Sequence, residues 1–272
     1  MNDKMELTQK TFSKIQKLIY QEIGVNLNAS KKTMVKSRLL KRLRTLNLNS
    51  FEKYLEFLNH NTDELVILYN FLTTNVTHFF REDHHFNFMK KQVLPELLNK
   101  NKKVVRVWSA GCSSGEEVYT LAIVLKEFFP KDCTIKILGT DINTEVLKIA
   151  KTAIYSKKSV EKIPYKLLKK YFLLGKGKNK GFFKVKKSLT DLVTFGRLNL
   201  NDHNYPIKNK MDIIFCRNVF IYFDKKTQKT ILRRFYQQLL KNGYLFLGHS
   251  ESINLNDCKD PWESVFKTTY QK

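Results

Sequence analysis

The sequence predicts an α/β protein in which a Rossmann-like sheet carries a small antiparallel β insertion and follows an all-α N-terminal domain. Three observations support this fold class. A β-branched stretch at 104–107 leads into a small-residue turn at 110–115 and then into a helix with apolar residues on one face. The first seventy or so residues repeat apolar side chains at helical spacing. Residues 164–196 break the alternation of strand and helix.

We place the domain limits where these patterns change. The expected organisation is an all-α domain with a basic helix at 1–74, a linker at 75–92 and an α/β domain at 93–272, with the insertion at about 164–196.

Composition narrows the class of protein. The chain has no apolar run near the roughly 18 residues needed to span a bilayer, and its polar first ten residues do not resemble a signal peptide. The four cysteines are widely separated and form no C-x-x-C pair, which predicts neither a disulfide framework nor a zinc site. We expect a soluble, cytoplasmic protein without direct membrane insertion.

The N-terminal domain is expected to consist of short helices. Thr8 can cap the first helix, Gly24 can end it, and Ser30 can cap a second one. Between Lys31 and Arg44 this second helix has seven basic residues and no acid, while apolar residues recur at helical spacing. Its positive outer face is either a binding surface or an ordinary solvated face.

The turn at 110–115 opens a nucleotide-binding βαβ unit, because its small residues let the backbone approach a ligand at the start of a helix. Asp141, at the carboxyl end of the next strand, is placed to accept hydrogen bonds from two ribose hydroxyls. A pyrophosphate is disfavoured because G-x-G-x-x-G is absent and because Glu116 and Glu117 begin the helix. S-adenosylmethionine (AdoMet) has no phosphate and is cationic, so it fits better. Either glutamate is also a good ordinary first-turn residue.

The segment 73–85 interleaves polar and aromatic residues. It is either folded over a ligand or a helical connector whose phenylalanines belong to the core. His78, His84 and His85 have no cysteine or carboxylate at metal-ligand spacing, so no metal is expected.

The insertion is expected to contain a β-hairpin. Residues 173–186 predict two strands around a glycine- and lysine-rich turn, with 192–195 as a possible third strand. After the insertion, a buried strand at 212–215 is followed by Arg217, Asn218 and Tyr222, which are site candidates at its carboxyl end. A helix at 227–240 ended by Asn242 and Gly243, a strand at 244–247 and a last strand at 262–270 complete the prediction.

Six motifs occur in order along the chain: TNVTHFFRE, WSAGCSSGEE, LGTDI, LNL, FCRNVFIYF and LGHSES. In this order, and after a basic helical domain, they resemble the CheR family of chemotaxis receptor methyltransferases over essentially the whole chain. Val118 departs from the pattern, because many members have proline after the paired glutamates. Since proline at that early helical position only presets φ, the departure should affect helix rigidity more than chemistry.

The resemblance implies an AdoMet-dependent protein-glutamate O-methyltransferase of bacterial chemotactic adaptation, with S-adenosylhomocysteine (AdoHcy) as product and no metal. Glu117 would hold the methionine amino group, a choice over Glu116 that comes from the family pattern alone. Asp141 would hold the ribose and Asn199 with Leu200 the adenine. The implied cofactor contacts are Asn75, Thr77, Arg81, Glu117, Asp141, Asn199, Leu200, Arg217 and Asn218. Arg81 and Tyr222 are the expected catalytic residues beside the reacting groups.

The resemblance also implies a partner, the cytoplasmic helical domain of methyl-accepting chemotaxis receptors. Because their methylation helices are rich in glutamate, Lys36, Arg38, Arg42 and Arg44 are expected to bind them. A receptor C-terminal peptide could also bind the insertion, as in some relatives.

Two rival functions are an RNA methyltransferase and a non-catalytic AdoMet-binding signalling scaffold. The net charge of +24 supports the first. However, amine-methylating enzymes typically present an Asp/Asn-Pro-Pro-aromatic turn where this chain has Cys216 to Val219, so no nucleic acid is expected as a partner. The presence of Arg81 and Tyr222 argues against the scaffold.

Overall fold

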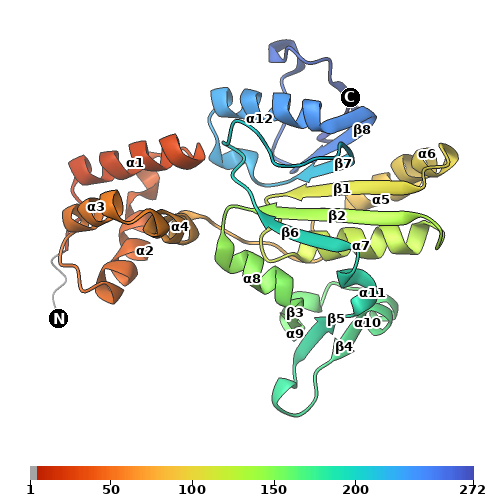
Figure 1. Cartoon of the computed structure of the whole chain (residues 1–272), viewed down its shortest axis with the longest axis horizontal. Helices are drawn as coiled ribbons and strands as arrows, with labels where there is room; N and C mark the ends of the chain where they lie inside the picture. The colour runs from red at the N-terminus through yellow and green to blue at the C-terminus, as the bar shows by residue number, and fades with distance from the viewer. Residues whose placement is uncertain (1–4) are drawn as a thin grey trace.

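The computed structural model describes residues 5–272. The chain forms a helical layer, a central sheet covered on both faces and a small second sheet, which is inserted within the chain of the central sheet (Figure 1). The helical layer contains α1 (Gln9–Ile23), the 3-10 turn η1 (Ala29–Lys31), α2 (Lys32–Thr45), α3 (Phe51–His60) and α4 (Thr62–Leu72). Every helix within residues 5–272 is too short or too polar to span a bilayer.

The helical layer has its own hydrophobic core. Phe12, Ile15 and Ile19 of α1 are fully buried, as are Leu39 of α2 and Tyr54 of α3. The spacing of three and four residues along α1 places its apolar side chains on one face, and burial of that face stabilises the helix far more than its intrinsic propensity does.

The predicted ends of α1 are confirmed, whereas the predicted cap of α2 is wrong. The Thr8 hydroxyl accepts a hydrogen bond from the Thr11 N–H, and Gly24 ends α1 in the left-handed region, as expected. The expectation for Ser30 was wrong. Ser30 lies inside η1 and donates to Asn28 Oδ1 (2.6 Å), so α2 continues from the 3-10 turn without a side-chain cap.

The central sheet has the strand order β6-β2-β1-β7-β8-β10-β9. The five strands from β6 to β8 are parallel, and β10 and β9 form an antiparallel edge. This Rossmann-like arrangement after an all-α layer confirms the predicted fold class. The strands are β1 (Val104–Ala110), β2 (Thr134–Asp141), β6 (Val193–Arg197), β7 (Met211–Cys216), β8 (Leu239–Leu247), β9 (Glu263–Phe266) and β10 (Thr269–Gln271).

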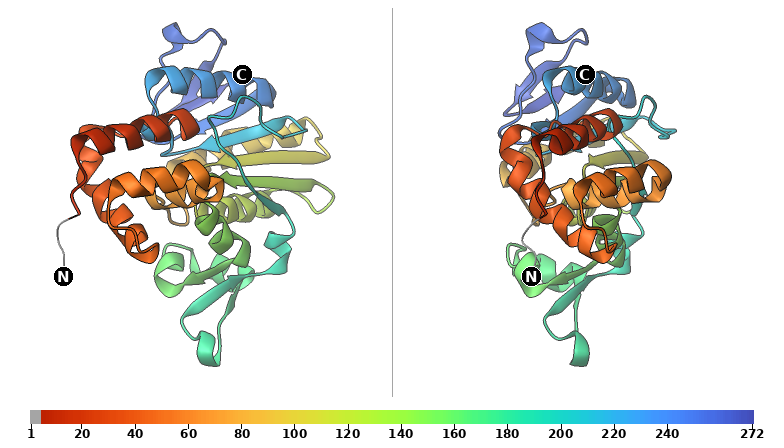
Figure 2. Two further views of the ribbon diagram at one scale, coloured as in Figure 1. Left: turned by 60° about the vertical axis from the view of Figure 1, so that its left-hand side comes forward. Right: turned by 90° about the vertical axis from the view of Figure 1, so that its left-hand side faces the viewer.

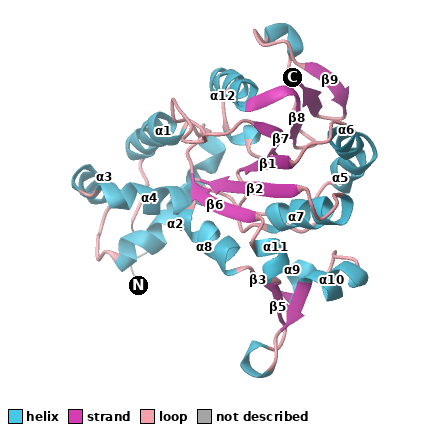
Figure 3. Cartoon of the chain, turned by 45° about the vertical axis from the view of Figure 1, so that its right-hand side comes forward, coloured by secondary structure: helices cyan, strands magenta, loops and turns pink. Residues whose placement is uncertain are grey.

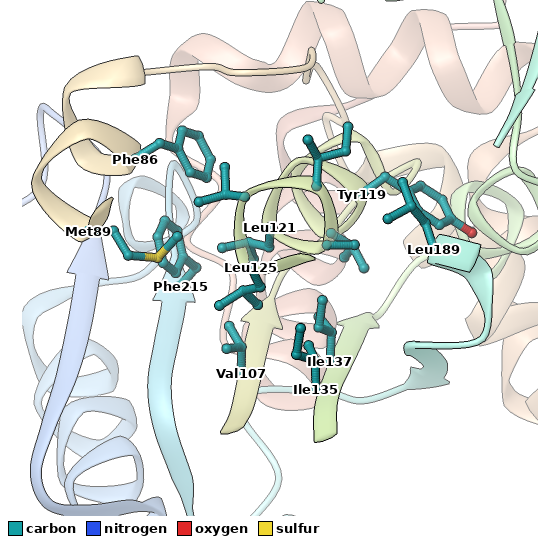
Figure 4. Packing of buried hydrophobic residues seen from close by; sticks show 14 of the residues in the cluster. Phe86, Met89, Val107, Tyr119, Leu121, Leu125, Ile135, Ile137, Leu189 and Phe215 are labelled. Carbon is teal, nitrogen blue, oxygen red and sulfur yellow. The ribbon is translucent and has the colours of Figure 1, made fainter. Parts of the chain in front are cut away.

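Helices cover both faces of this sheet (Figure 3). Val107 and Phe215 point to one face, where Leu121 and Met89 pack against them (Figure 4), whereas Trp108 points to the other. The first face carries α5 (Asp83–Phe88), a π turn (Met89–Val93), α6 (Leu94–Asn99) and α7 (Glu116–Phe128), and the second carries α12 (Lys225–Gln238). Alternation along each strand therefore supplies two cores.

The small sheet corrects one prediction about the insertion. The hairpin of β4 (Phe172–Leu174) and β5 (Phe182–Val185) is present, but the third strand is β3 (Ile154–Ser156), which pairs with β5. The stretch at 192–195 instead belongs to β6 of the central sheet and runs parallel to β2. The small sheet thus begins before residue 164, at β3. Strand β3 was not predicted from the sequence because a strand of three residues leaves almost no periodic signal. Around these strands lie α8 (Thr144–Thr152), α9 (Lys157–Val160), α10 (Tyr165–Tyr171), η3 (Gly177–Asn179) and α11 (Lys187–Thr190).

The C-terminal part holds two further corrections. Helix α12 ends at Gln238, and Asn242 and Gly243 lie inside β8, where the register with β7 shifts and Asn242 has φ 60°. They mark a bulge rather than a helix end. The single last strand expected at 262–270 is a hairpin of β9 and β10. The 3-10 turns η4 (Phe220–Tyr222) and η5 (Leu255–Asp257) complete the chain.

Candidate functional site

A cavity of about 500 Å³ lies at the carboxyl ends of β1, β2 and β7. The helical layer lies over this end of the sheet (Figure 2). A two-residue bridge between Val25 and Phe223, with a hydrogen bond from the Asn26 N–H to the Tyr222 carbonyl (2.8 Å), joins the layer to the sheet domain there. Such a volume is typical of small-molecule sites. Its walls come from residues of the helical layer between 19 and 34, from 72–77 and 81 on the segment that precedes α5, and from 111–113, 117, 141–142, 198–200, 217–219 and 221–223 of the sheet domain.

The turn between β1 and α7 forms the floor of the cavity. Gly111 and Gly115 have backbone φ angles of 84° and 93°, which residues other than glycine rarely adopt. A Cβ on Gly111 would meet Val219 Cγ2 at 2.4 Å. The N–H groups of Gly111 and Cys112 both donate to the Thr140 carbonyl, which holds the turn against β2. Both glycines are therefore required by backbone geometry.

Asp141 ends β2 on the cavity wall and is 8% exposed. Its Oδ2 accepts a hydrogen bond from the Ser113 N–H (2.8 Å) and its Oδ1 one from the Asn143 N–H (2.9 Å). Burial raises the pKa of Asp141, although these backbone hydrogen bonds oppose the rise. Each oxygen keeps a free lone pair, so the carboxylate can accept two further hydrogen bonds from a diol.

The two glutamates at the start of α7 have different surroundings. Glu117 lies on the cavity wall, where it accepts from Ser109 Oγ (2.7 Å) and from Arg217 Nε (2.7 Å). Glu116 is not among the lining residues, and it accepts instead from Ser114 Oγ (2.6 Å). Burial raises the pKa of Glu116.

Arg217 is the centre of a buried charge network. Its guanidinium group is 2% exposed, pairs with Glu117, and donates through Nη1 to the Arg81 carbonyl (2.6 Å). The rings of Phe86 and Phe215 lie 5.1 and 5.4 Å from it. Sequence reasoning placed Arg217 in the pocket but missed that its main partner is Glu117, since the two residues are a hundred positions apart.

The linker crosses one side of the cavity. Asn75, Thr77 and Arg81 all line it, and the Asn75 carbonyl accepts from Ser113 Oγ (2.9 Å). Of the segment 73–85, helix begins only at Asp83, so residues 73–82 are not the helical connector of the alternative interpretation, although Phe79 does belong to the core as that interpretation expected. Arg81 Nη1 donates to the Val76 carbonyl (2.8 Å) and leaves other guanidinium donors free.

Three further predicted residues also line the cavity. Leu200 is buried, while Asn199 lines the cavity but directs its amide nitrogen to the Glu22 carbonyl (2.8 Å). Among the described residues, Asn218 Oδ1 is buried and accepts no hydrogen bond. This buried oxygen therefore has an unused acceptor lone pair on a residue that lines the cavity.

Tyr222 lies on the cavity wall and donates through its hydroxyl to the Thr74 carbonyl (3.4 Å). Burial raises the pKa of Tyr222, so the phenol is neutral at physiological pH and remains a donor.

The basic helix α2 does not present all four expected cations to a partner. Arg42 forms a two-bond pair with Glu64, which is 4% exposed (2.8 and 2.6 Å). Arg38 Nη1 donates to three consecutive carbonyls at the end of α4 (2.8–3.1 Å). Both therefore have structural partners within the chain, because buried carboxylates and helix C-termini attract guanidinium groups. Lys36 is partly exposed and Arg44 exposed.

The fold corrects the sequence argument about the histidines. Glu82, His84 and His85 offer ligand atoms within 4.8 Å of one another, so a carboxylate does stand near two of them. However, Arg217 Nη1 lies 3.4 Å from His85 Nδ1 and 3.8 Å from Glu82 Oε2. A metal ion there would have to compete with a guanidinium charge, and the cluster is better described as part of the Arg217 network.

His85 is expected to make the protein sensitive to acid. Burial, with the charge of Arg217, lowers the pKa of His85 to about 4. The neutral ring fits the geometry, since Nε2 lies 3.2 Å from the Lys267 carbonyl and Arg217 faces Nδ1. In the unfolded chain the pKa is near 6.5, so stability should be lost as pH falls from about 6.5 to 4, by roughly 3 kcal/mol at most.

The check is urea unfolding of the wild type and His85→Gln at pH 7.5, 5.5 and 4.5. Glutamine can keep the hydrogen bond to the Lys267 carbonyl but cannot be protonated. The variant should therefore lose less stability on acidification than the wild type does. Parallel pH curves would show that His85 is not the titrating group.

Comparisons with known proteins agree with this architecture. A family model described as "CheR methyltransferase, all-alpha domain" matches residues 10–73, and one described as "CheR methyltransferase, SAM binding domain" matches residues 75–270. A chemotaxis protein methyltransferase of Borreliella burgdorferi is 39% identical over 100% of this chain and 97% of its own. Those of Salmonella typhimurium and Escherichia coli are 41% and 40% identical, each over 93% of this chain and 88% of its own.

Proposed function

The chain belongs to the CheR methyltransferase family, and we propose that it transfers the methyl group of AdoMet to glutamate side chains of methyl-accepting chemotaxis receptors. The products are glutamate methyl esters and AdoHcy, and the role is adaptation in bacterial chemotaxis. We place this activity in the cytoplasm, where the four free cysteines would remain reduced.

The observation that carries the proposal is that Glu117, in the first turn of α7, and Asp141, at the end of β2, both line the cavity. Two carboxylates would repel a pyrophosphate but suit a cationic nucleoside. Glu117 would hold the amino group and Asp141 the ribose diol. Asn218 lines the same cavity, and we expect it to contact the cofactor there.

The remaining cavity residues take roles by their position and the family pattern. Asn75 and Thr77 would contact the cofactor from the linker, Asn199 and Leu200 would border the adenine, and Arg217 would act through Glu117. Arg81 and Tyr222 would face the transferred methyl group and the incoming carboxylate. Support comes from the cavity, because every one of these residues lines it.

The chemistry demands orientation rather than proton transfer. AdoMet supplies an electrophilic methyl group, and a glutamate with a pKa near 4.3 is about 99% ionised at pH 7, so no general base is needed. Arg81 can orient the carboxylate by charge-assisted hydrogen bonds while a lone pair stays free. Val76 and Ile221, which are 75% and 54% exposed at the cavity rim, would exclude water when the receptor docks.

Asp141→Ala should weaken AdoHcy binding by ten- to a hundredfold, because hydrogen bonds to a charged group contribute about 1.5–3 kcal/mol. Isothermal titration calorimetry measures this. Asp224→Ala is a matched control, since Asp224 also accepts from a backbone N–H (Thr227, 2.8 Å) but caps α12 outside the cavity. Equal losses of affinity in the two variants would refute the ribose assignment.

For receptor binding we propose those cations of α2 that have no carboxylate or main-chain carbonyl partner within residues 5–272. Reversing Lys36, Lys41 and Arg44 to glutamate should lower kcat/KM for a receptor fragment about tenfold at low salt, with a smaller effect at high salt. AdoHcy affinity should not change. The control reverses Lys208, Lys210 and Lys241, which are exposed near the amino ends of β7 and β8. A loss of equal size in both triple variants would mean that only net charge matters.

One assay tests the function itself. The protein is incubated with methyl-labelled AdoMet and a receptor cytoplasmic fragment, or with RNA, and the product is treated with mild base. Carboxyl methyl esters release methanol, whereas methylated bases do not. Base-stable label on RNA would support the nucleic-acid alternative, and AdoHcy binding without any transfer would support a scaffold.

A further inference from the structure

We propose that Glu82 is a positioning residue for methyl transfer, which fixes the backbone of Arg81 and the guanidinium group of Arg217. The inference rests on the proposed function, because it concerns the same site. Glu82 does not line the cavity, and none of the roles assigned so far explains its contacts.

The backbone around Arg81 has an unusual conformation. Both of its neighbours, Phe80 and Glu82, have φ of 55°. Residues other than glycine avoid this left-handed region, and two such residues flanking a third persist only where surrounding contacts hold them. The turn directs Arg81 to the cavity while Phe79 stays fully buried in the core.

The Phe80 N–H donates to Thr120 Oγ1 (3.2 Å), and the other side-chain contacts across this turn include four to the Glu82 carboxylate, which is 9% exposed. Its Oε2 accepts from the His249 N–H (3.1 Å), and its Oε1 lies 2.8 Å from His249 Nδ1. Oε1 also accepts from Asn218 Nδ2 (3.2 Å), and Arg217 Nη1 lies 3.8 Å from Oε2. Burial alone would raise the pKa of Glu82, but these donors together lower it. One carboxylate thus ties the linker to the loops that follow β7 and β8.

Two consequences reach the site from these contacts. Arg217 Nη1 donates to the Arg81 carbonyl (2.6 Å), so the guanidinium charge that Glu82 attracts also fixes the residue before it. Arg217 Nε in turn pairs with Glu117 (2.7 Å), the proposed partner of the cofactor's amino group. Loss of the Glu82 charge should therefore loosen Arg81, the proposed substrate contact, directly. It should loosen Glu117, the proposed cofactor contact, indirectly through Arg217.

The chain offers a matched control. Glu64 is a buried carboxylate bound to an arginine, as Glu82 is, but its partner Arg42 belongs to the helical layer and neither residue lines the cavity. Glu64→Gln should cost stability through loss of a buried charge pair. It has no route to Arg81 or Arg217.

The test compares Glu82→Gln, Glu82→Asp and Glu64→Gln with the wild type. We measure kcat and KM for the receptor fragment, AdoHcy affinity, melting temperature, and hydrogen exchange of residues 75–82 in the ligand-free protein. For Glu82→Gln we expect kcat to fall at least tenfold, AdoHcy affinity to fall three- to tenfold, receptor KM to stay within twofold, and exchange in the linker to quicken. Glu82→Asp keeps the charge and should recover part of kcat, whereas Glu64→Gln should leave kcat and AdoHcy affinity within twofold.

Several results would overturn the proposal. One is a Glu82→Gln enzyme with kcat within twofold of the wild type and an equally protected linker. Another is a Glu64→Gln enzyme that loses kcat as strongly as Glu82→Gln does. If Glu82→Gln fails to fold, His249→Ala removes only the exposed donor to Oε1, and an unchanged linker exchange rate in that variant would count against the proposal. If the wild type forms no methyl ester, the proposed function fails. The hydrogen exchange of residues 75–82 and the AdoHcy affinity of the variants would still test whether Glu82 positions the linker and Arg217.

Discussion

Arg81→Ala should lower kcat for receptor methylation by ten- to a hundredfold while leaving AdoHcy affinity within a few-fold of the wild type. Arg81 lines the cavity from the linker, and the only hydrogen bond of its side chain within the described residues goes to the Val76 carbonyl, so most of its guanidinium donors remain free for a substrate carboxylate. Removing charge-assisted hydrogen bonds costs about 1.5–3 kcal/mol, which corresponds to that range of rates. Steady-state kinetics with labelled AdoMet measure it.

Arg81→Lys serves as the conservative comparison. Lysine keeps the charge but presents a point donor rather than a planar fork, so its kcat should lie between those of alanine and the wild type. An Arg81→Ala enzyme with full turnover would remove this residue from the reaction, whatever the outcome for the cofactor residues.

Arg217→Met should destabilise the protein by about 3–5 kcal/mol and abolish measurable AdoHcy binding. The substitution removes the partner of the Glu117 carboxylate and leaves it beside Glu82 without a compensating charge. Breaking a buried ion pair by removing one partner typically has this cost. Denaturant unfolding gives the free energy, and calorimetry at a temperature where the variant is folded gives the binding.

Arg42→Met provides the comparison, because it breaks the pair with Glu64 in the helical layer (2.6 Å). It should also destabilise the protein, but the folded variant should bind AdoHcy normally. If Arg217→Met bound AdoHcy as tightly as Arg42→Met, Glu117 would not need its arginine and the proposed network would be wrong.

The elements that were predicted correctly are those with strong local signals. The strand from Val104, the small-residue turn and the helix with Val118 and Leu121 on one face occur as expected, because strand alternation, glycine turns and helical spacing each act within a few residues. The Thr8 cap and the Gly24 end of α1 are local in the same sense.

The failures in strand assignment share a non-local cause, whereas the failed cap at Ser30 is local, since Ser30 donates to Asn28 two residues away. Residues 192–195 have the composition of a strand, but they pair with β2, where Val193 lies opposite Ile137, and not with the nearby hairpin. Ile154 to Ser156 form a strand only because β5 lies beside them. The composition indicates an extended conformation for 192–195 but not for 154–156, and for both segments the tertiary structure decides which sheet they join.

The site shows the same division. Asp141 and the glycine turn could be placed from the pattern of one βαβ unit, and the family pattern supplied the other cavity residues. The pairs of Arg217 with Glu117, Glu82 with His249 and Arg42 with Glu64 connect residues 22 to 167 positions apart. Sequence-spacing rules cover only a few residues and cannot predict such pairs. The only sequence signal for them was a charged residue at an expected buried position without an opposite charge nearby in the sequence.

The bridge between Val25 and Phe223 has a kinetic consequence. The cavity is closed on one side by a helical layer and on the other by a sheet domain, and each has its own hydrophobic core. The cavity already opens to solvent at Val76 and Ile221, and separation of these two bodies with opening of the bridge would widen that route for AdoHcy to leave and AdoMet to enter. We expect that hinge motion, which typically takes microseconds to milliseconds, to set the dwell time of AdoHcy and so the ceiling on turnover.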